Sequence, residues 1–227
     1  MDRKNVLDGA RSSIPICLGL IPIGISYGLL AVEAGLTKIQ TVLMSATVMA
    51  GSSQILAVGM IGQASVITIV IAVFLINLRH MVMSCSVMND IKKTPLVRKL
   101  FYAFTLSDES SALFMLSAKR SEAFLLGANV TIYLTWVLGS FLGCMLGQFL
   151  PELVAKSFGV AFYASFIAML MPHVKKSVGI ALLVLLAAVM NTLLQLVLPV
   201  SWAMIIAMIA SAAIGTFFVK EDGDAAE

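Results

Sequence analysis

Charged residues are scarce in this chain. They make up 12% of its 227 residues, about half the share usual in soluble domains, whereas 60% of the residues are hydrophobic. This composition excludes a soluble globular domain, and long uncharged runs place the chain among membrane proteins. Lys and Arg exceed Asp and Glu by three. In a membrane protein this excess marks the cytoplasmic side, so a nucleic-acid partner has no support.

Motifs for catalysis are also missing from the sequence. It contains no H-E-x-x-H, no G-x-S-x-G and no phosphate-binding loop, and its cysteines lie inside apolar runs without C-x-x-C spacing. We therefore expect no enzyme activity, no metal site and no cofactor. Cys17, Cys85 and Cys144 are interpreted as small buried hydrophobic residues.

Uncharged runs long enough for membrane helices follow one another along the chain. Residues 12–32 form the first run, and its 21 residues exceed the apolar core of a cleavable signal peptide. The uncharged run at positions 39–78 would reach about 60 Å as one helix, twice the hydrocarbon core, so we expect a break at residues 51–54 or 59–63. Further segments are expected at residues 100–118, 123–150, 157–174, 177–198 and 201–219. The prediction is an all-α integral membrane protein with a single polytopic domain over residues 1–227 and a disordered cytoplasmic tail at 220–227.

The distribution of Lys and Arg favours about six transmembrane helices plus two re-entrant or broken-helix segments. If all eight segments crossed, eight basic residues would lie on the cytoplasmic side and six outside, which is hardly a bias. If residues 39–60 and 100–118 enter the membrane and leave it on the same side, twelve basic residues lie on the cytoplasmic side and only Lys38 and Lys156 lie outside. This arrangement places both termini in the cytoplasm.

Four polar or helix-breaking features lie about half a bilayer, or about ten helical residues, from the nearest charged end. They are Pro22 with Gly24, the Gly51–Gln54 turn, Arg79, and the acidic pair Asp108 and Glu109. Non-helical backbone survives at this depth only where it lines a cavity or is buried in protein. Features that converge near the midplane are typical of the central site of a transporter.

Arg79 lies in the motif Asn77-Leu78-Arg79-His80, inside an apolar run. Charges inside a membrane segment are costly and usually functional, so Arg79 is a candidate for binding a substrate carboxylate, with Asn77 beside it. The alternative is a structural ion pair with the acidic pair, because a guanidinium is the best partner for a buried carboxylate. His80 is a candidate for proton transfer, although a single histidine is more often a packed, hydrogen-bonding residue.

Asp108 and Glu109 form the second charged motif, within Ser107-Asp108-Glu109-Ser110. Two adjacent carboxylates near the midplane repel each other and lose their water, which favours protonation of at least one of them. Proton coupling requires such a group. The alternative is an interfacial helix with both acids in water, which the flanking apolar residues oppose.

Small residues give the remaining candidates. Gly51, Ser52, Ser53 and Gln54 offer hydroxyls, an amide and backbone N–H groups to an ammonium or carboxylate; the alternative is a tight turn without a ligand.

Proline and glycine also predict where the first helix bends and where helices pack closely. Pro22 and Gly24 predict a helix break or kink, with Gly28 adding close packing. The series Gly139, Gly143 and Gly147 predicts a tight helix contact, either within the chain or with a partner protein.

At these residues the sequence resembles the AzlC family, the large subunits of bacterial branched-chain amino acid exporters. The resemblance rests on four motifs in the first half of the chain: Pro22-x-Gly24-x-x-x-Gly28, Ala50-Gly51-Ser52-Ser53-Gln54, Asn77-Leu78-Arg79-His80 and Ser107-Asp108-Glu109-Ser110. Ser107 stands where we expect Thr, a change that keeps the hydroxyl. The resemblance implies export of branched-chain and other apolar amino acids across the inner membrane, with a small hydrophobic AzlD-type protein as the second subunit.

The residue chemistry fits this substrate class. A zwitterionic amino acid needs one receptor for its carboxylate and one for its ammonium, a few ångströms apart, with an apolar pocket beside them. We expect a multi-pass protein surrounded by lipid that couples amino-acid transport to protons. Two rival hypotheses are a carrier of another small solute and a non-transporting assembly subunit whose polar centre is an ion-pair lock.

Overall fold

The computed structural model describes residues 2–118, 120–146 and 177–218, together with residues 167, 171, 174 and 175. Every regular element among these residues is an α-helix, which confirms the predicted fold class. The chain divides into two compact units, residues 1–61 with 73–162 and residues 62–72 with 163–227. The single membrane domain over residues 1–227 stays a prediction, and the predicted tail at 220–227 and most of the segment at 157–174 lie outside the described residues.

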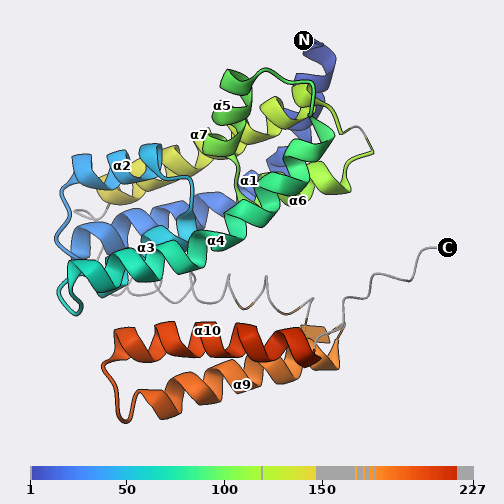
Figure 1. Ribbon diagram of the computed structural model, residues 1–227. Helices are drawn as coiled ribbons and strands as arrows, with labels where there is room; N and C mark the ends of the chain where they lie inside the picture. The colour runs from blue at the N-terminus through green and yellow to red at the C-terminus, as the bar shows by residue number, and fades with distance from the viewer. Residues whose placement is uncertain are drawn as a thin grey trace. The chain divides into compact units, whose positions relative to one another are not determined.

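The first unit is built on α1 (Arg3–Glu33), α7 (Glu122–Leu146) and the part of α4 (Val66–Asp90) from Val73 onward; the preceding turns of α4 are grouped with the second unit. Each of these three helices is long and apolar enough to cross a membrane. Along the chain, a pair of short helices connects each long helix to the next (Figure 1). The first pair is α2 (Lys38–Thr47) with α3 (Gly51–Met60), and the second is α5 (Leu96–Thr105) with α6 (Asp108–Leu116).

The second unit contains α9 (Val178–Leu194) and α10 (Val200–Phe218). Gly215, near the end of α10, faces the side chain of Leu183, near the start of α9, so the two helices are antiparallel. They match the apolar segments predicted at residues 177–198 and 201–219.

Glycines hold α1 and α7 together in parallel. A Cβ placed on Gly24 would lie 3.1 Å from the Cα of Gly139, and one on Gly28 would lie 2.7 Å from the backbone nitrogen of Cys144. Further such contacts follow toward the start of both helices, with Gly9 on Phe124 and Gly127 on Val6. Gly139 and Gly143 therefore make their tight contact within the chain; Gly147 lies outside the described residues.

α1 is continuous through Pro22 and Gly24, so the predicted helix break is wrong. Proline removes one helix hydrogen bond, which costs about 3 kcal/mol in an isolated helix. Packing along α7 on the glycine face offsets that cost, and the Ser26 hydroxyl donates a hydrogen bond to the Pro22 carbonyl at 2.8 Å.

The cysteines differ in their burial. Cys17 and Cys144, on the packed helices α1 and α7, are buried as expected, whereas Cys85 on α4 is exposed. The interpretation of Cys85 as a buried residue is therefore wrong. Much of the α4 surface is exposed in this unit, and a small apolar residue there is compatible with contact to lipid.

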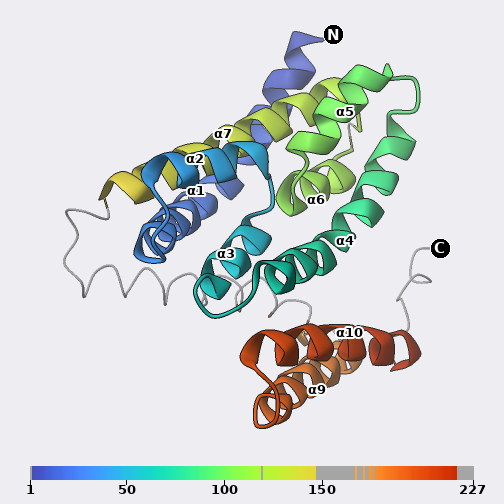
Figure 2. The same cartoon turned by 60° about the vertical axis from the view of Figure 1, so that its left-hand side comes forward.

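Two ion pairs show the direction of α4. Asp90, the last residue of α4, lies 3.5 Å from Arg120, which precedes α7, and Arg98 of α5 lies 2.8 Å from Glu122, the first residue of α7. α4 therefore ends where α5 and α7 begin, and it runs antiparallel to α1 and α7. It follows that α5–α6 starts and finishes at this end, whereas α2–α3 starts and finishes at the other end (Figure 2). Each pair therefore begins and ends at one end of the unit, which is the path expected of a re-entrant hairpin; its position relative to a membrane stays a prediction.

The hairpin and the long helix after it occur twice. The first copy has helices of 10, 10 and 25 residues (α2, α3, α4), and the second has helices of 10, 9 and 25 residues (α5, α6, α7). The second copy starts at the end of the unit opposite to the start of the first. This order of helices resembles the inverted repeats of secondary transporters.

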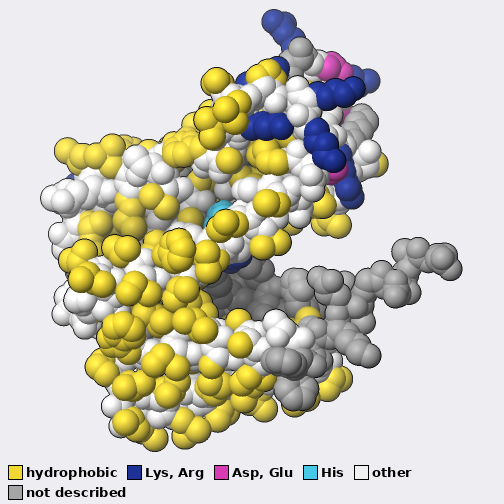
Figure 3. Space-filling view, viewed as in Figure 1, with side chains coloured by type: hydrophobic (Ala, Val, Ile, Leu, Met, Phe, Trp, Pro, Cys, Tyr) yellow, Lys and Arg dark blue, Asp and Glu magenta, His cyan; other side chains and the backbone are white. Residues whose placement is uncertain are grey.

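Basic side chains gather at the end where the N-terminus and α5 lie, and large hydrophobic side chains cover much of the remaining visible surface (Figure 3). The exposed basic residues at this end are Arg3, Lys4, Lys92, Lys93, Arg98 and Arg120. Such an asymmetry marks the cytoplasmic end of a membrane protein.

The first prediction tests this orientation by cysteine labelling in a background without Cys17, Cys85 and Cys144. Val97→Cys and Ala118→Cys, both at the basic end, should resist a membrane-impermeant maleimide in intact cells and react after permeabilisation. Glu33→Cys, at the opposite end, should react in intact cells and is the positive control. Reaction of Val97→Cys or Ala118→Cys in intact cells would contradict the assigned orientation.

The second prediction tests the glycine contact. Gly28→Ala places a methyl group against the α7 backbone and should destabilise the protein by roughly 1–3 kcal/mol, seen as a lower midpoint in a thermal unfolding scan in detergent. The matched control is Gly19→Ala on the same helix, where an added Cβ meets no atom within 4 Å. Equal midpoints for the two variants would show that the contact carries no stability.

Candidate functional site

The two hairpins turn inside the apolar part of the unit, and each second helix starts there. α3 begins at Gly51 after a break at Val48–Ala50, and α6 begins at Asp108 after a break at Leu106–Ser107. The residues predicted to interrupt the helices therefore form the first turns of new ones. A helix N-terminus presents unpaired backbone N–H groups and a partial positive charge, which favour an anion nearby.

Arg79, near the middle of α4, connects these two starting points. One of its terminal nitrogens lies 2.7 Å from a carboxylate oxygen of Asp108 and donates a hydrogen bond to the hydroxyl of Ser52. About a third of the Arg79 side chain and a quarter of the Asp108 side chain remain exposed. The guanidinium thus ties α4 to the first turn of both α3 and α6, while both charged groups stay accessible.

The start of α6 carries a capping box formed by two serines. The Ser107 hydroxyl accepts a hydrogen bond from the backbone N–H of Ser110, and the Ser110 hydroxyl accepts one from the backbone N–H of Ser107. Asp108 and Glu109 occupy the first turn, where the helix dipole stabilises negative charge. Both acidic side chains are half-buried, so neither lies in bulk water.

The start of α3 differs because Ala50 precedes it and no side chain caps its N–H groups. The first turn of α3 also carries no acidic residue. Its neighbours on α4 are Arg79 and Asn77, whose amide nitrogen donates to the Ser53 hydroxyl at 3.2 Å. An uncapped helix start beside a guanidinium is suited to a carboxylate.

Three buried polar atoms on α4 have no hydrogen-bond partner within the described part of the chain. They are Asn77 Oδ1, Arg79 Nε and His80 Nε2. Buried polar groups are nearly always paired with protein, water or a ligand. Their clustering within one turn of α4 indicates a place where a ligand or water completes the hydrogen bonding.

Gln54 has a different environment from the other residues of its motif. Its side chain is fully buried; the amide oxygen accepts from the Trp136 indole at 2.8 Å, and the amide nitrogen donates to the Ser45 hydroxyl at 3.3 Å. Ser45 in turn donates to Ser140 of α7 at 2.7 Å. The side chain of Trp136 also fills the space in front of Gly51. The Gln54 amide therefore fixes the first hairpin to α7.

A second polar cluster fixes the other hairpin to α7. Glu122 pairs with Arg98 and accepts hydrogen bonds from Tyr102 at 2.9 Å and Thr94 at 3.0 Å. Farther along α7, the Asn129 amide donates to Thr105 and to the Tyr102 carbonyl. These contacts hold α5 along α7 and thereby fix the position of Asp108.

The sequence motifs identified Gly143 but not Glu122, Asn129 or Trp136, although a common pattern links all four residues. Glu122, Asn129, Trp136 and Gly143 recur every seven residues along α7, which places them on one face of a helix. Trp136 and the two polar residues bind the hairpins, and Gly143 contacts α1.

Within the residues that the structure describes, no group of three or more His, Cys, Asp or Glu side chains could hold a metal ion. The available chemistry is that of a guanidinium, two carboxylates, an imidazole and two helix starts. This set can bind an ion with both signs of charge and can hold a proton.

Comparison with known proteins gives consistent matches. The family described as AzlC protein matches residues 15–150, a range that includes every candidate site residue. An uncharacterized membrane protein of Archaeoglobus fulgidus is 32% identical over 170 residues, which cover 74% of this chain and 75% of that protein. The inner membrane protein YgaZ of Escherichia coli is 26% identical over 149 residues, covering 63% of this chain and 61% of YgaZ.

A further relative is the branched-chain amino acid transport protein AzlC of Bacillus subtilis. It is 25% identical over 142 residues, covering 60% of this chain and 56% of that protein. The match thus spans less than two thirds of the Escherichia coli and Bacillus subtilis proteins. No solved structure matches the chain.

The third prediction separates a binding role of the Arg79–Asp108 pair from a purely structural one. Removing one charge leaves the other unpaired, whereas neutralising both removes that penalty. We expect Arg79→Met to lower the amount of protein in the membrane and Arg79→Met/Asp108→Asn to restore it, measured by immunoblot. Solute transport by the double variant should remain at least tenfold below wild type, because a lost hydrogen bond to a charged group costs roughly 1.5–3 kcal/mol.

The matched control is the ion pair at the end of α4. Asp90→Asn/Arg120→Met neutralises a pair that lies outside the site and should keep both membrane level and transport. Recovery of transport in Arg79→Met/Asp108→Asn would show that the Arg79–Asp108 ion pair has only a structural role.

Proposed function

Because the chain belongs to the AzlC family, we propose that it is the large subunit of a secondary transporter that exports branched-chain amino acids across the cytoplasmic membrane. The observation that carries this proposal is the meeting of Arg79, Asp108 and the starts of α3 and α6 inside the membrane unit. An inverted repeat with helix starts at its centre is the arrangement many secondary transporters use to hold a small charged substrate.

The charges of the site match those of a free amino acid. The substrate carboxylate would bind Arg79 and the uncapped start of α3, and the substrate ammonium would bind the carboxylates of Asp108 and Glu109. In the structure Arg79 and Asp108 neutralise each other at 2.7 Å. A zwitterion can separate them without leaving either charge unpaired, which avoids the cost of a single buried charge.

The same acidic pair supports proton coupling. A proton on Asp108 and an ammonium beside Asp108 and Glu109 compete for the same negative charge, so one displaces the other. Competition of this kind exchanges protons for substrate, and an inward proton gradient then drives export. Asp108 is the proposed proton carrier because of its contact with Arg79, with Glu109 as the partner of the ammonium.

The partner and the orientation are part of the proposal. The resemblance to two-component exporters supports a small hydrophobic AzlD-type membrane protein as second subunit, and the basic end of the first unit supports a cytoplasmic N-terminus. Since Gly139 and Gly143 are occupied by α1, the second subunit is expected to bind another surface of the chain.

The fourth prediction tests substrate and coupling together. Everted membrane vesicles from cells that produce the chain with its small subunit should accumulate radiolabelled leucine when the lumen is acidified, and a protonophore should abolish the accumulation. Transport by the chain alone at the rate of the pair would contradict the role of the second subunit.

Competition in the same vesicles tests whether both substrate charges are recognised. Unlabelled leucine should compete at least tenfold better than 4-methylpentanoate, which lacks the ammonium, or 3-methylbutylamine, which lacks the carboxylate. Vesicles containing Arg79→Met serve as the negative control. Equal competition by all three compounds, or no uptake by wild type, would contradict the proposed function.

A further inference from the structure

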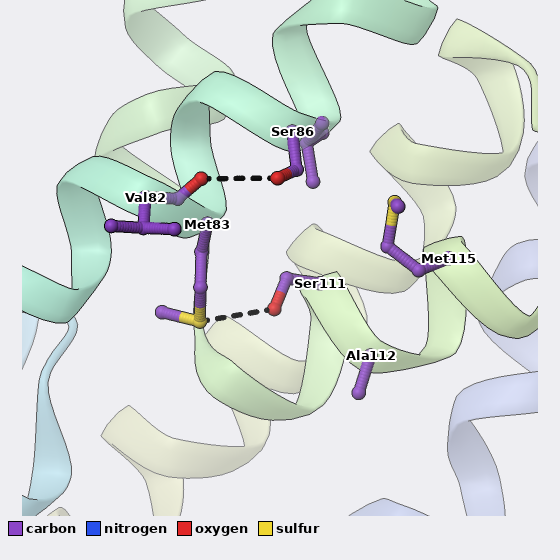
Figure 4. A pocket seen from close by; sticks show the side chains of 7 residues that line it. Val82, Met83, Ser86, Ser111, Ala112 and Met115 are labelled. Atoms are coloured by element: carbon purple, nitrogen blue, oxygen red, sulfur yellow. Dashed lines mark hydrogen bonds between the residues drawn. The ribbon is translucent and has the colours of Figure 1, made fainter. Parts of the chain in front are cut away.

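An apolar pocket lies between α4 and α6, one helical turn beyond the central ion pair. It has a volume of about 180 Å³. On α4, Met83 follows Arg79 by four residues, and on α6, Ser111 follows Asp108 by three, so pocket and ion pair lie on the same helix faces. Figure 4 shows Met83 and Ser111 pointing toward each other across the gap, with Ala112 and Met115 on the α6 side. The complete lining is Val82, Met83, Ser86, Val87, Ser111, Ala112 and Met115.

The chemistry of the lining selects an aliphatic group. Five of the seven lining side chains are hydrocarbon or thioether groups. The two hydroxyls are already engaged: Ser86 donates to the Val82 carbonyl at 3.2 Å, and Ser111 lies 3.0 Å from the Asp108 carbonyl and 3.3 Å from the Met83 sulfur. A polar side chain placed here would lose water without gaining a hydrogen bond from the lining, which is unfavourable.

The size of the pocket is sufficient for the side chain of an aliphatic amino acid. An apolar cavity of about 150 Å³ is large enough to bind benzene, which has six carbons. Methionines line both helices, and their flexible side chains adapt to differently branched hydrocarbon groups. The Ser111 hydroxyl contacts both the Met83 sulfur and the Asp108 carbonyl, so the pocket lies directly beside the acidic end of α6.

We infer that this pocket binds the aliphatic side chain of the transported amino acid and determines which side chains are accepted. This inference rests on the proposed function, in which Arg79 and the acidic pair bind the charged groups of the same molecule. It adds the residues that set specificity: Met83 and Val87 on α4, and Ala112 and Met115 on α6.

The test compares side-chain preference in variants that change the pocket volume. Ala112→Phe fills the pocket, so leucine should compete for uptake of radiolabelled alanine at least tenfold less well than in wild type, whereas competition by unlabelled alanine should change little. Ala103→Phe makes the same substitution on α5, at a position that is exposed like Ala112 but does not line the pocket, and is the matched control. It should keep the wild-type order of competitors.

Met83→Ala changes the pocket in the opposite direction and does not introduce a bulky residue. It should improve competition by phenylalanine relative to leucine, with membrane levels of all variants checked by immunoblot. An unchanged ratio of leucine to alanine in Ala112→Phe, or of phenylalanine to leucine in Met83→Ala, would overturn the pocket assignment and leave the proposed function standing. Wild-type vesicles that transport no amino acid would overturn both.

Discussion

Two helices of the first unit begin inside its apolar part, and the backbone N–H groups at these helix starts need hydrogen-bond partners. This requirement constrains the whole first unit. Each hairpin contains one of these helix starts, and every buried N–H group there that finds no partner carries a cost of several kcal/mol. α6 meets this requirement with the reciprocal Ser107 and Ser110 cap. α3 has no side-chain cap, and the groups of Arg79 and Asn77 that contact its first turn are donors to Ser52 and Ser53, so its backbone N–H groups stay available to an acceptor. The difference between these two helix starts makes one side of the site suitable for an anion and the other for a cation.

α7 is the scaffold that brings the two helix starts together. Its glycines allow α1 to approach backbone to backbone, and its polar side chains fix both hairpins, with Glu122 and Asn129 on α5 and with Trp136 and Ser140 on α2 and α3. These side-chain hydrogen bonds hold both hairpins against α7 and thereby fix the positions of Ser52 and Asp108.

The inverted repeat is symmetric in its helices but not in its interfaces. In each copy, side chains of the second hairpin helix also contact the long helix of the other copy. Between α3 and α7 this interface is filled, because Trp136 packs on Gly51 and bonds to Gln54. Between α6 and α4 the corresponding interface contains the pocket beside Met83 and Ser111. One half of the unit thus provides rigidity, and the other provides a space next to the charges.

The sequence by itself determined the membrane class, the all-helical fold and the interruption of the apolar segments near Gly51 and Asp108. These properties depend on local composition, on residue counts along a helix and on the one-sided distribution of Lys and Arg. Only the tertiary structure decided that Arg79 reaches Asp108 and Ser52 at once, that the Gln54 amide is used by Trp136, and that α1 passes Pro22 without a break. The physical reason is that residue spacing fixes only where a side chain lies along a helix and on which face of that helix. Which other helix packs against that face depends on contacts between residues far apart in the sequence, such as the backbone contact between Gly24 and Gly139.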